Sequence, residues 1–133
     1  MTRRPSCGIV RHMQDDKTRK NQDIRSAIIG GMTYSERKEI EDQCEELARE
    51  SGFNLVMIGT GDERNALAAS IVGYDNKTHA LIYDYDLMVK CFSDWDGMSE
   101  DEAIEWIEYN TIGCLPEDTE TTKRPIVMNR MEA

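Results

Sequence analysis

Hydrophobic residues recur at helical spacing in three stretches of the chain, and a capping signal precedes each one. Thr33–Glu36 and Ser99–Glu102 have the form of capping boxes, in which a hydroxyl and a carboxylate satisfy backbone N–H groups, and Asp84 can act alone as a cap. A glycine follows each stretch, as is common where helices end. The pattern therefore predicts three amphipathic helices, over residues 34–51, 85–96 and 100–112.

Short apolar runs bounded by turn residues predict strands. These runs cover residues 53–58, 66–74, 79–83 and 126–128. Between the first two, Gly59–Arg64 superficially resembles a phosphate-cradling loop, but it lacks the spacing of the glycine motifs and contains two acidic residues that repel phosphate. We interpret it as a hairpin or an exposed loop. The order of elements predicts a single small α+β domain with a mostly antiparallel sheet of three to four strands.

Charge is divided unevenly along the chain. Residues 1–31 carry seven Lys or Arg against three Asp, a net charge of +4, whereas residues 32–133 carry nine against 23 acidic residues, a net charge of −14. Gly30-Gly31 marks the boundary, and the first capping box follows it directly. We therefore divide the chain into a basic N-terminal arm, residues 1–31, and an acidic α+β domain, residues 32–133. An uneven distribution of charge affects which partners a protein attracts and how fast it associates with them, but it does not indicate the fold.

The composition indicates an intracellular protein. No apolar run approaches the roughly 20 residues that span a bilayer, and no apolar signal core is present near residue 1. The four cysteines, at positions 7, 44, 91 and 114, lack the close pairs of a zinc site or a disulfide framework. We therefore expect free, mostly buried thiols in a cytoplasmic protein without a cofactor, a metal site or membrane contact.

Motifs in the second half of the chain resemble those of a known family. They are Tyr83-Asp84-Tyr85-Asp86, then Asp96-Gly97-Met98-Ser99, then the run from Glu102 to Asn110 followed by Gly113. In the form YDYD…DGMS.DEAIEWIEYN..G, the chain is similar over about residues 66–128 to a family of small uncharacterised bacteriophage and prophage proteins. Where relatives often continue into a G-x-x-T-P segment, this chain has Thr121-Thr122-Lys123-Arg124-Pro125, and residues 1–31 have no counterpart. The resemblance implies a mobile element and the cytoplasm of a bacterial host; it implies no activity.

The last predicted helix carries the candidate partner-binding surface. Two of its aromatic residues lie partly round from the apolar stripe, and aromatic residues are over-represented at the centres of interfaces. The candidate partner-binding residues are Trp106, Tyr109, Glu105, Glu102, Asp101, Asp84 and Asp86. The alternative is that the rings close the edge of the core, while the acids are helix caps and solvated faces. Both interpretations stay open on the sequence alone.

Our leading hypothesis is a non-enzymatic interaction protein of a phage or mobile element. Its acidic, aromatic surface would occupy a basic surface of a host nucleic-acid-binding machine, such as a CRISPR effector, and so act as an anti-defence inhibitor. Direct binding of the acidic body to nucleic acid is opposed electrostatically. Nucleic-acid contact is therefore expected only through the arm, whose candidate residues are Arg3, Arg4, Arg11, Arg19 and Lys20.

Two alternatives come from other classes of protein. One is a small-ligand or nucleotide-binding module with hydrolytic activity, built around Asp84 and Asp86 as paired carboxylates. His79 could serve there as a general base, but no Ser, Cys or Lys is placed locally as a nucleophile, so we assign no catalytic residue. The other alternative is a structural role in a virion or homo-oligomer, with the arm exchanged between subunits.

Overall fold

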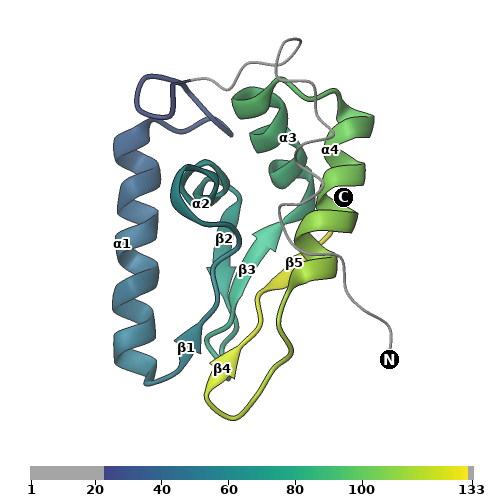
Figure 1. Cartoon of the computed structure of the whole chain (residues 1–133). Coiled ribbons are helices and arrows are strands. Elements are labelled where there is room, and N and C mark those ends of the chain that lie inside the picture. The colour runs from purple at the N-terminus through teal and green to yellow at the C-terminus, as the bar shows by residue number, and fades with distance from the viewer. Residues whose placement is uncertain (1–22, 132–133) are drawn as a thin grey trace.

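The computed structural model describes residues 23–131. Its elements, in chain order, are α1 (Tyr34–Ser51), β1 (Asn54–Leu55), α2 (Gly61–Ala68), β2 (Ile71–Tyr74), β3 (Leu81–Asp84), α3 (Tyr85–Asp96), α4 (Glu100–Trp106), β4 (Thr122–Lys123) and β5 (Ile126–Met128). A π-helical turn (Ile107–Thr111) and a 3₁₀ turn (Ile112–Cys114) directly follow α4. This small α+β domain confirms the predicted fold class (Figure 1).

The three predicted helix starts are confirmed by their caps. The Thr33 hydroxyl accepts a hydrogen bond from the Glu36 N–H at 3.2 Å, and the Glu36 carboxylate accepts one from the Thr33 N–H at 2.9 Å. Ser99 and Glu102 form the same reciprocal pair in front of α4. Asp84 caps α3 by accepting from the N–H of the third helical residue. The glycines that end α1 and α3 adopt left-handed φ angles of 79° and 70°, which favour glycine.

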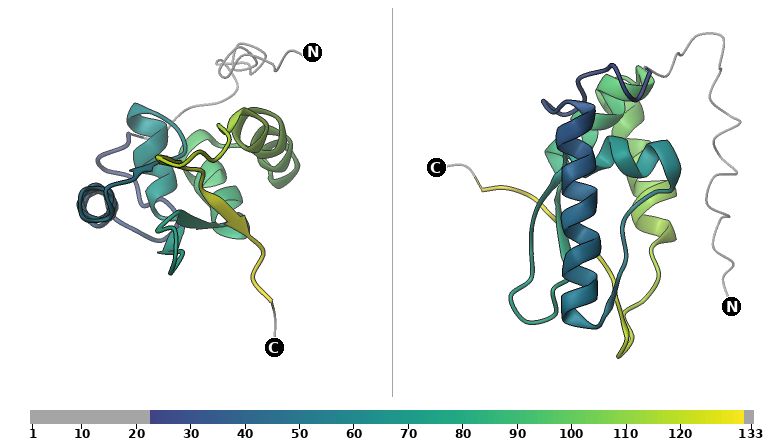
Figure 2. Two further views of the ribbon diagram at one scale, coloured as in Figure 1. Left: turned by 90° about the horizontal axis from the view of Figure 1, so that it is seen from below. Right: turned by 90° about the vertical axis from the view of Figure 1, so that its left-hand side faces the viewer.

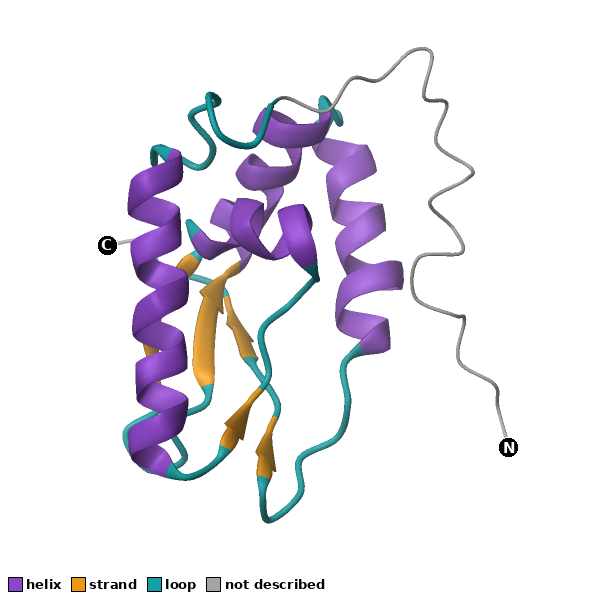
Figure 3. Ribbon diagram, turned by 60° about the vertical axis from the view of Figure 1, so that its left-hand side comes forward, coloured by secondary structure: helices purple, strands orange, loops and turns teal. Residues whose placement is uncertain are grey.

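The strands form two small sheets, seen together in Figure 3. In the three-stranded sheet β3 is central, antiparallel to β2 and parallel to β5. The second sheet is the parallel pair of β1 and β4. The expected antiparallel pairing thus holds for β2 and β3, which a short turn connects. The other two pairs are parallel because long crossover connections, containing helices, separate their strands in the chain.

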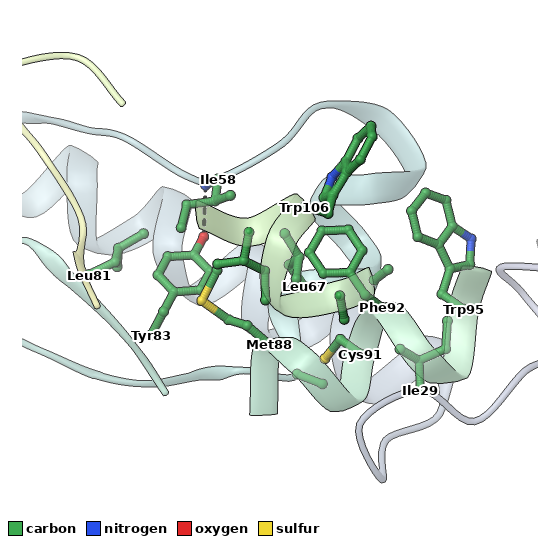
Figure 4. Close-up of a cluster of buried hydrophobic side chains, with 14 of the residues drawn as sticks. Ile29, Ile58, Leu67, Leu81, Tyr83, Met88, Cys91, Phe92, Trp95 and Trp106 are labelled. Carbon is green, nitrogen blue, oxygen red and sulfur yellow. Dashed lines mark hydrogen bonds between the residues drawn. The ribbon is translucent and has the colours of Figure 1, made fainter. Parts of the chain in front are cut away.

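The helices lie to one side of the three-stranded sheet (Figure 2), and α1 and α4 lie on opposite sides of the molecule (Figure 1). α2 lies between α1 and α3, and it contacts both. Residues from all these elements form the core; the most deeply buried include Leu67, Leu81, Tyr83, Met88 and Phe92 (Figure 4). The core therefore depends on contacts between segments that are far apart in the sequence.

The structure corrects the prediction for residues 59–74. The chain was expected to form a loop and then a strand from Ala66 to Tyr74, but α2 occupies residues 61–68 and β2 begins only at Ile71. Every residue from Asn65 to Ser70 is buried. A short apolar run without a polar face carries no periodicity, so sequence alone cannot separate a buried helix from a buried strand.

The domain boundary also differs from the prediction at Gly30-Gly31. Ile29, assigned to the arm, is fully buried in the core, and the Gly30 N–H donates a hydrogen bond to the Asp94 carboxylate at 2.9 Å. The buried guanidinium of Arg37 donates at 2.8 and 3.0 Å to the carbonyls of Ile24 and Ala27. Residues 23–31 are therefore part of the folded domain, which begins at or before residue 23. The remainder of the predicted arm, residues 1–22, lies outside the described residues.

Two of the cysteines confirm the expected buried thiols. Burial raises the pKa of Cys44 to about 11 and that of Cys91 to about 12, so both stay protonated at neutral pH. Cys114 is disulfide-bonded, so the expectation of a free thiol is wrong there, and Cys7 lies outside the described residues. No helix within residues 23–131 combines the length and the apolar character needed to cross a membrane.

Candidate functional site

A cleft of about 690 Å³ opens between the segment before and within α2 and the segment that includes α4 and its two following turns. We call it the α2–α4 cleft. The first wall comprises Val56, Met57, Ile58, Gly59, Thr60, Asp62, Glu63 and Arg64; the second comprises Trp95, Trp106, Asn110, Thr111, Cys114, Leu115 and Pro116. Ligand pockets commonly have about this volume and a mixed lining of apolar and polar groups.

The first wall is held in place by backbone contacts. The buried hydroxyl of Tyr83 accepts a hydrogen bond from the Ile58 N–H at 2.9 Å, which fixes the end of the segment that follows β1 (Figure 4). At Gly59 the backbone takes a φ angle of 87°, and a Cβ there would lie 3.0–3.1 Å from Glu63 Cγ and the Arg64 nitrogen. The Arg64 Nε donates to the Gly59 carbonyl at 3.1 Å. Glycine is therefore needed for the sharp turn into α2.

The second wall contains a π-helical turn. Such turns are rare in proteins, and those that occur are often found at functional sites. α4 changes to π-helical geometry after Trp106, and Asn110 and Thr111 lie in this turn. The Asn110 Oδ1 is buried and has no hydrogen-bond partner among the described residues. The structure thus leaves a buried acceptor at the cleft. A buried polar atom without a partner is costly, and it invites a functional explanation.

Two indole rings line the same cleft. Trp95 is 4% exposed and Trp106 is 7% exposed, so most of each ring belongs to the core. Figure 4 shows both at the same end of the core cluster, near Phe92. Trp106 was predicted to lie on a partner-binding surface; the structure corrects this, because the ring packs in the core and is largely buried.

The opposite side of α4 carries an exposed acidic surface. We call it the outer α4 face, and it consists of Asp101, Glu102, Ile104, Glu105, Glu108 and Tyr109, all exposed. Ile104 is 37% exposed and Tyr109 is 53% exposed. Neither Asp101 nor Glu105 forms an ion pair within residues 23–131. The candidate residues of the last helix other than Trp106 are thus all exposed on this surface.

One hydrogen bond connects the outer α4 face to α3. The Tyr85 hydroxyl donates to the Glu108 carboxylate at 2.7 Å. Burial and this bond to the Glu108 carboxylate raise the pKa of Tyr85 to about 12. Asp86, another candidate residue, is exposed in the first turn of the same helix. The start of α3 and the π-helical turn after α4 therefore adjoin.

Asp84 was assigned to the partner-binding surface, and the structure contradicts this. Its side chain is 1% exposed; one oxygen accepts from the Leu87 N–H at 3.2 Å, and the other binds the Arg130 guanidinium. Asp84 is thus a buried helix cap that is not available to a partner. Paired carboxylates at Asp84 and Asp86 also fail as a metal site: residues 23–131 contain no cluster of three or more His, Cys, Asp or Glu that could hold a metal ion.

Sequence analysis missed most of the α2–α4 cleft. Gly59–Arg64 was considered for phosphate binding and rejected. The arm residues Arg3, Arg4, Arg11, Arg19 and Lys20 lie outside the described residues. The one local signal in the cleft was a polar Asn near the end of a helix. Comparison with protein-family models, with curated proteins and with solved structures finds no match to this chain.

Proposed function

We propose that this protein is a non-enzymatic interaction protein that binds a basic surface of another protein through the outer α4 face. The observation that carries the proposal is the combination of exposed apolar side chains and exposed carboxylates on one helix. Residues 91–122 contain ten Asp or Glu and no Lys or Arg. Such a surface attracts basic partners and accelerates their association.

The two exposed apolar residues supply short-range affinity that charge alone lacks. Tyr109 and Ile104 lie among the carboxylates of the outer α4 face. Tyrosine is enriched among residues that dominate binding energy, and truncating such a residue costs about 2 kcal/mol or more. Surface charge is screened within about 8–10 Å at physiological salt, whereas burial of apolar area is not. The partner should therefore remain bound at moderate ionic strength.

The outer α4 face is also held in a fixed conformation before binding. The capping box of Ser99 and Glu102 fixes the start of α4, and the bond from Tyr85 to Glu108 fixes the π-helical turn after α4 against α3. A surface that is ordered in advance loses less conformational entropy on association. This supports a binding role, in preference to a solvated face without a partner.

The class of partner follows from the charge and from the family resemblance. Proteins that bind nucleic acid carry basic grooves, because their affinity depends on neutralising phosphates. In a phage or mobile element, an acidic protein that occupies such a groove would inhibit a host machine, including a defence complex such as a CRISPR effector. The alternative of a nucleotide-hydrolysing module at Asp84 is disfavoured by the burial of that carboxylate.

Matched variants of the full chain test this proposal by affinity capture from a bacterial lysate. The face variant carries Asp101→Asn, Glu105→Gln and Tyr109→Ser; the control carries Glu39→Gln, Glu45→Gln and Tyr74→Ser. Both lose two charges and one tyrosine, and the two tyrosines are 53% and 54% exposed. We expect the wild type and the control to retain one basic protein at about 0.15 M salt, and the face variant to lose it. Equal loss from both variants, or capture of no basic protein by the wild type, would refute the proposal.

A further inference from the structure

We infer that a disulfide between Cys7 and Cys114 holds the basic segment before residue 23 across the α2–α4 cleft and beside the outer α4 face, so that reduction of this bond exposes the face. The inference rests on the proposed function for what the exposed face binds, whereas its covalent part stands alone. The segment, residues 1–22, lies outside the described residues. Its attachment follows from the cysteines, the length of the chain and the charges.

The partner of Cys114 follows from the number of cysteines. The chain contains four, at positions 7, 44, 91 and 114. Cys114 is disulfide-bonded, whereas Cys44 and Cys91 are free and buried. Cys7 is therefore the one cysteine of the chain that remains to pair with Cys114. The raised pKa values of the two buried thiols disfavour exchange with this bond, because the thiolate is the attacking species.

The chain is long enough for this link without any change in the domain. Sixteen residue steps separate position 7 from Asp23, the first described residue. A fully extended segment of this length spans about 53–58 Å. A folded domain of about this size has a radius of gyration of about 13 Å, so every point of its surface lies within that reach. Cys114 itself is only half-buried, in the 3₁₀ turn that follows the π-helical turn.

The α2–α4 cleft is not an empty pocket. Cys114 lies in its second wall. Other lining residues take part in interactions additional to those described above; they are Glu63, Trp95, Trp106 and Leu115. A segment that is anchored at Cys114 and crosses the cleft accounts for the disulfide and for these interactions together.

The link brings arginines to the carboxylates of the outer α4 face. A disulfide holds its two Cα atoms about 4.4–6.8 Å apart. Arg3 and Arg11 are each four residues from Cys7, so their Cα atoms lie within about 14 Å of it. Glu108 precedes Cys114 by six residues, which corresponds to about 9 Å of helical rise. Long side chains at positions 3 and 11 can therefore reach the carboxylates around Glu108.

Charge complementarity favours this contact. Residues 1–22 carry six Lys or Arg against two Asp, a net charge of +4. Residues 91–122 include Cys114 and the outer α4 face, and all of their charged side chains are acidic. A basic segment held within about 8 Å of these carboxylates is attracted to them even at physiological salt. It therefore competes with a basic partner for the same face.

Reduction by a cytoplasmic thiol such as glutathione opens the link. A glutathione thiolate attacks one sulfur of the protein disulfide, the S–S bond breaks, and a mixed disulfide forms. A second glutathione thiolate attacks the mixed disulfide, which gives glutathione disulfide and a second protein thiolate. Two electrons thus pass from two glutathione molecules to the protein, and each protein thiolate takes up one of the protons that they release. Disulfides in cytosolic proteins are usually transient or redox-sensing, which fits a switch.

The size of the effect follows from the length of the tether. In the oxidised chain Arg3 and Arg11 are each held by a tether of four residues, through Cys7. In the reduced chain they are connected only through Asp23, by tethers of 20 and 12 residues. Effective concentration falls roughly as the −3/2 power of tether length, so a fourfold longer tether lowers it by about eightfold. Reduction should therefore strengthen the binding of a basic partner by up to about eightfold.

Thiol counting and peptide mapping test the link itself. The full-length protein, purified without reductant and unfolded in guanidinium chloride, should show two reactive thiols per chain, and four after reduction. Trypsin and a Glu-specific protease together separate Cys91 from Cys114, so mass spectrometry should find a Cys7 peptide joined to a Cys114 peptide. Four thiols before reduction, or a disulfide-linked dimer on a non-reducing gel, would overturn the inference.

A fluorescent octa-arginine peptide serves as the basic probe of the outer α4 face, and its binding is measured by anisotropy. We expect the reduced wild type to bind it up to about eightfold more tightly than the oxidised wild type. Cys7→Ser should bind it as the reduced wild type does, with or without reductant. Equal binding by the oxidised and the reduced wild type would show that the link does not cover the face, and the inference would be wrong.

Two matched charge variants show whether the basic segment itself covers the face. The segment variant carries Arg3→Gln, Arg4→Gln and Arg11→Gln. The control removes three exposed cations of the domain, by Lys38→Gln, Arg49→Gln and Lys77→Gln. The segment variant should bind octa-arginine equally in both redox states, while the control keeps the wild-type difference. Loss of the difference in both variants would show only an effect of net charge and would contradict the inference.

The two readouts separate this inference from the proposed function. Redox-dependent binding of octa-arginine without capture of a basic protein from the lysate would refute the proposed function and support the inference. Capture of a basic protein to the same extent by oxidised and reduced protein would support the proposed function and overturn the inference. In the reduced state, Asp101→Asn combined with Glu105→Gln should weaken octa-arginine binding; unchanged binding would place the peptide away from the outer α4 face and contradict the inference.

Discussion

Substitution of Gly30 tests the revised boundary of the domain most directly. Gly30 has a φ angle of 60°, and a Cβ built on it would lie 2.8 Å from Ala69 Cβ and 2.8 Å from Cys91 Sγ. Both neighbours are short, buried side chains of the core, so neither can move aside easily. Gly31 is the matched control: its φ angle is 84°, but a Cβ at that position would have no neighbouring atom within 4 Å.

The two alanine variants differ in one physical contribution. Each places an alanine in the left-handed region, at a cost of about 1–2 kcal/mol. Gly30→Ala also overpacks the core, which adds about 1–3 kcal/mol. We therefore expect Gly30→Ala to lose about 2–5 kcal/mol of unfolding free energy and Gly31→Ala to lose about 1–2 kcal/mol.

Urea unfolding followed by tryptophan fluorescence measures this difference. With a denaturant slope of about 1.5 kcal/mol per molar, the midpoint of Gly30→Ala should lie about 0.7–2 M below that of Gly31→Ala. The slopes themselves should agree, which would show that the variants unfold the same cooperative unit. Coincident midpoints would refute the close packing of Gly30, and with it the inclusion of residues 23–31 in the core.

Two further predictions concern the links between the start of α3 and the rest of the domain. Arg130→Gln leaves the buried Asp84 carboxylate without its ionic partner. Because the arginine is largely exposed, we expect the unfolding free energy measured in urea to fall by only about 1–2 kcal/mol. The loss should be smaller when Asp84→Asn is added. Equal losses in the single and double variants would contradict the pairing. The pKa of Tyr85 is raised above that of an unfolded tyrosine, so its contribution to stability is complete below pH 10 and declines as the pH rises through about 12. Spectrophotometric titration should show this pKa falling toward 10 in Glu108→Gln, and an unchanged pKa would contradict the hydrogen bond as its cause.

The elements that sequence analysis predicted correctly are those with local causes. Thr33 and Ser99 each bond to a residue three positions away, and Gly52 and Gly97 end helices through their own backbone freedom. These interactions involve one helical turn, so a short window of sequence contains both partners. β5 at 126–128 was recognised from its apolar run for the same local reason.

The elements that were predicted wrongly have causes elsewhere in the chain. Ala66 to Ser70 are buried, and the helix that contains the first of them packs against α1 and α3; nothing in the run itself distinguishes this from a strand. Gly30 was assigned to the boundary of the domain, but a Cβ at this position would clash with the side chains of Ala69 and Cys91, so only glycine fits there. The sequence around Asp84 predicts an exposed carboxylate, but the side chain is buried and binds the guanidinium of Arg130, 46 positions later in the chain.

The sequence by itself determined where α1, α3 and α4 begin, where α1 and α3 end, and that the surface of α4 is acidic, because capping and formal charge depend on residues close together in the chain. Only the tertiary structure decided which of these residues are exposed and which are buried. Trp106 does not lie on the outer α4 face; it lines the same cleft as Gly59–Arg64, Trp95 and Asn110. Those residues come from three separate segments, and their proximity follows from how the apolar faces of the helices pack, which local patterns do not encode.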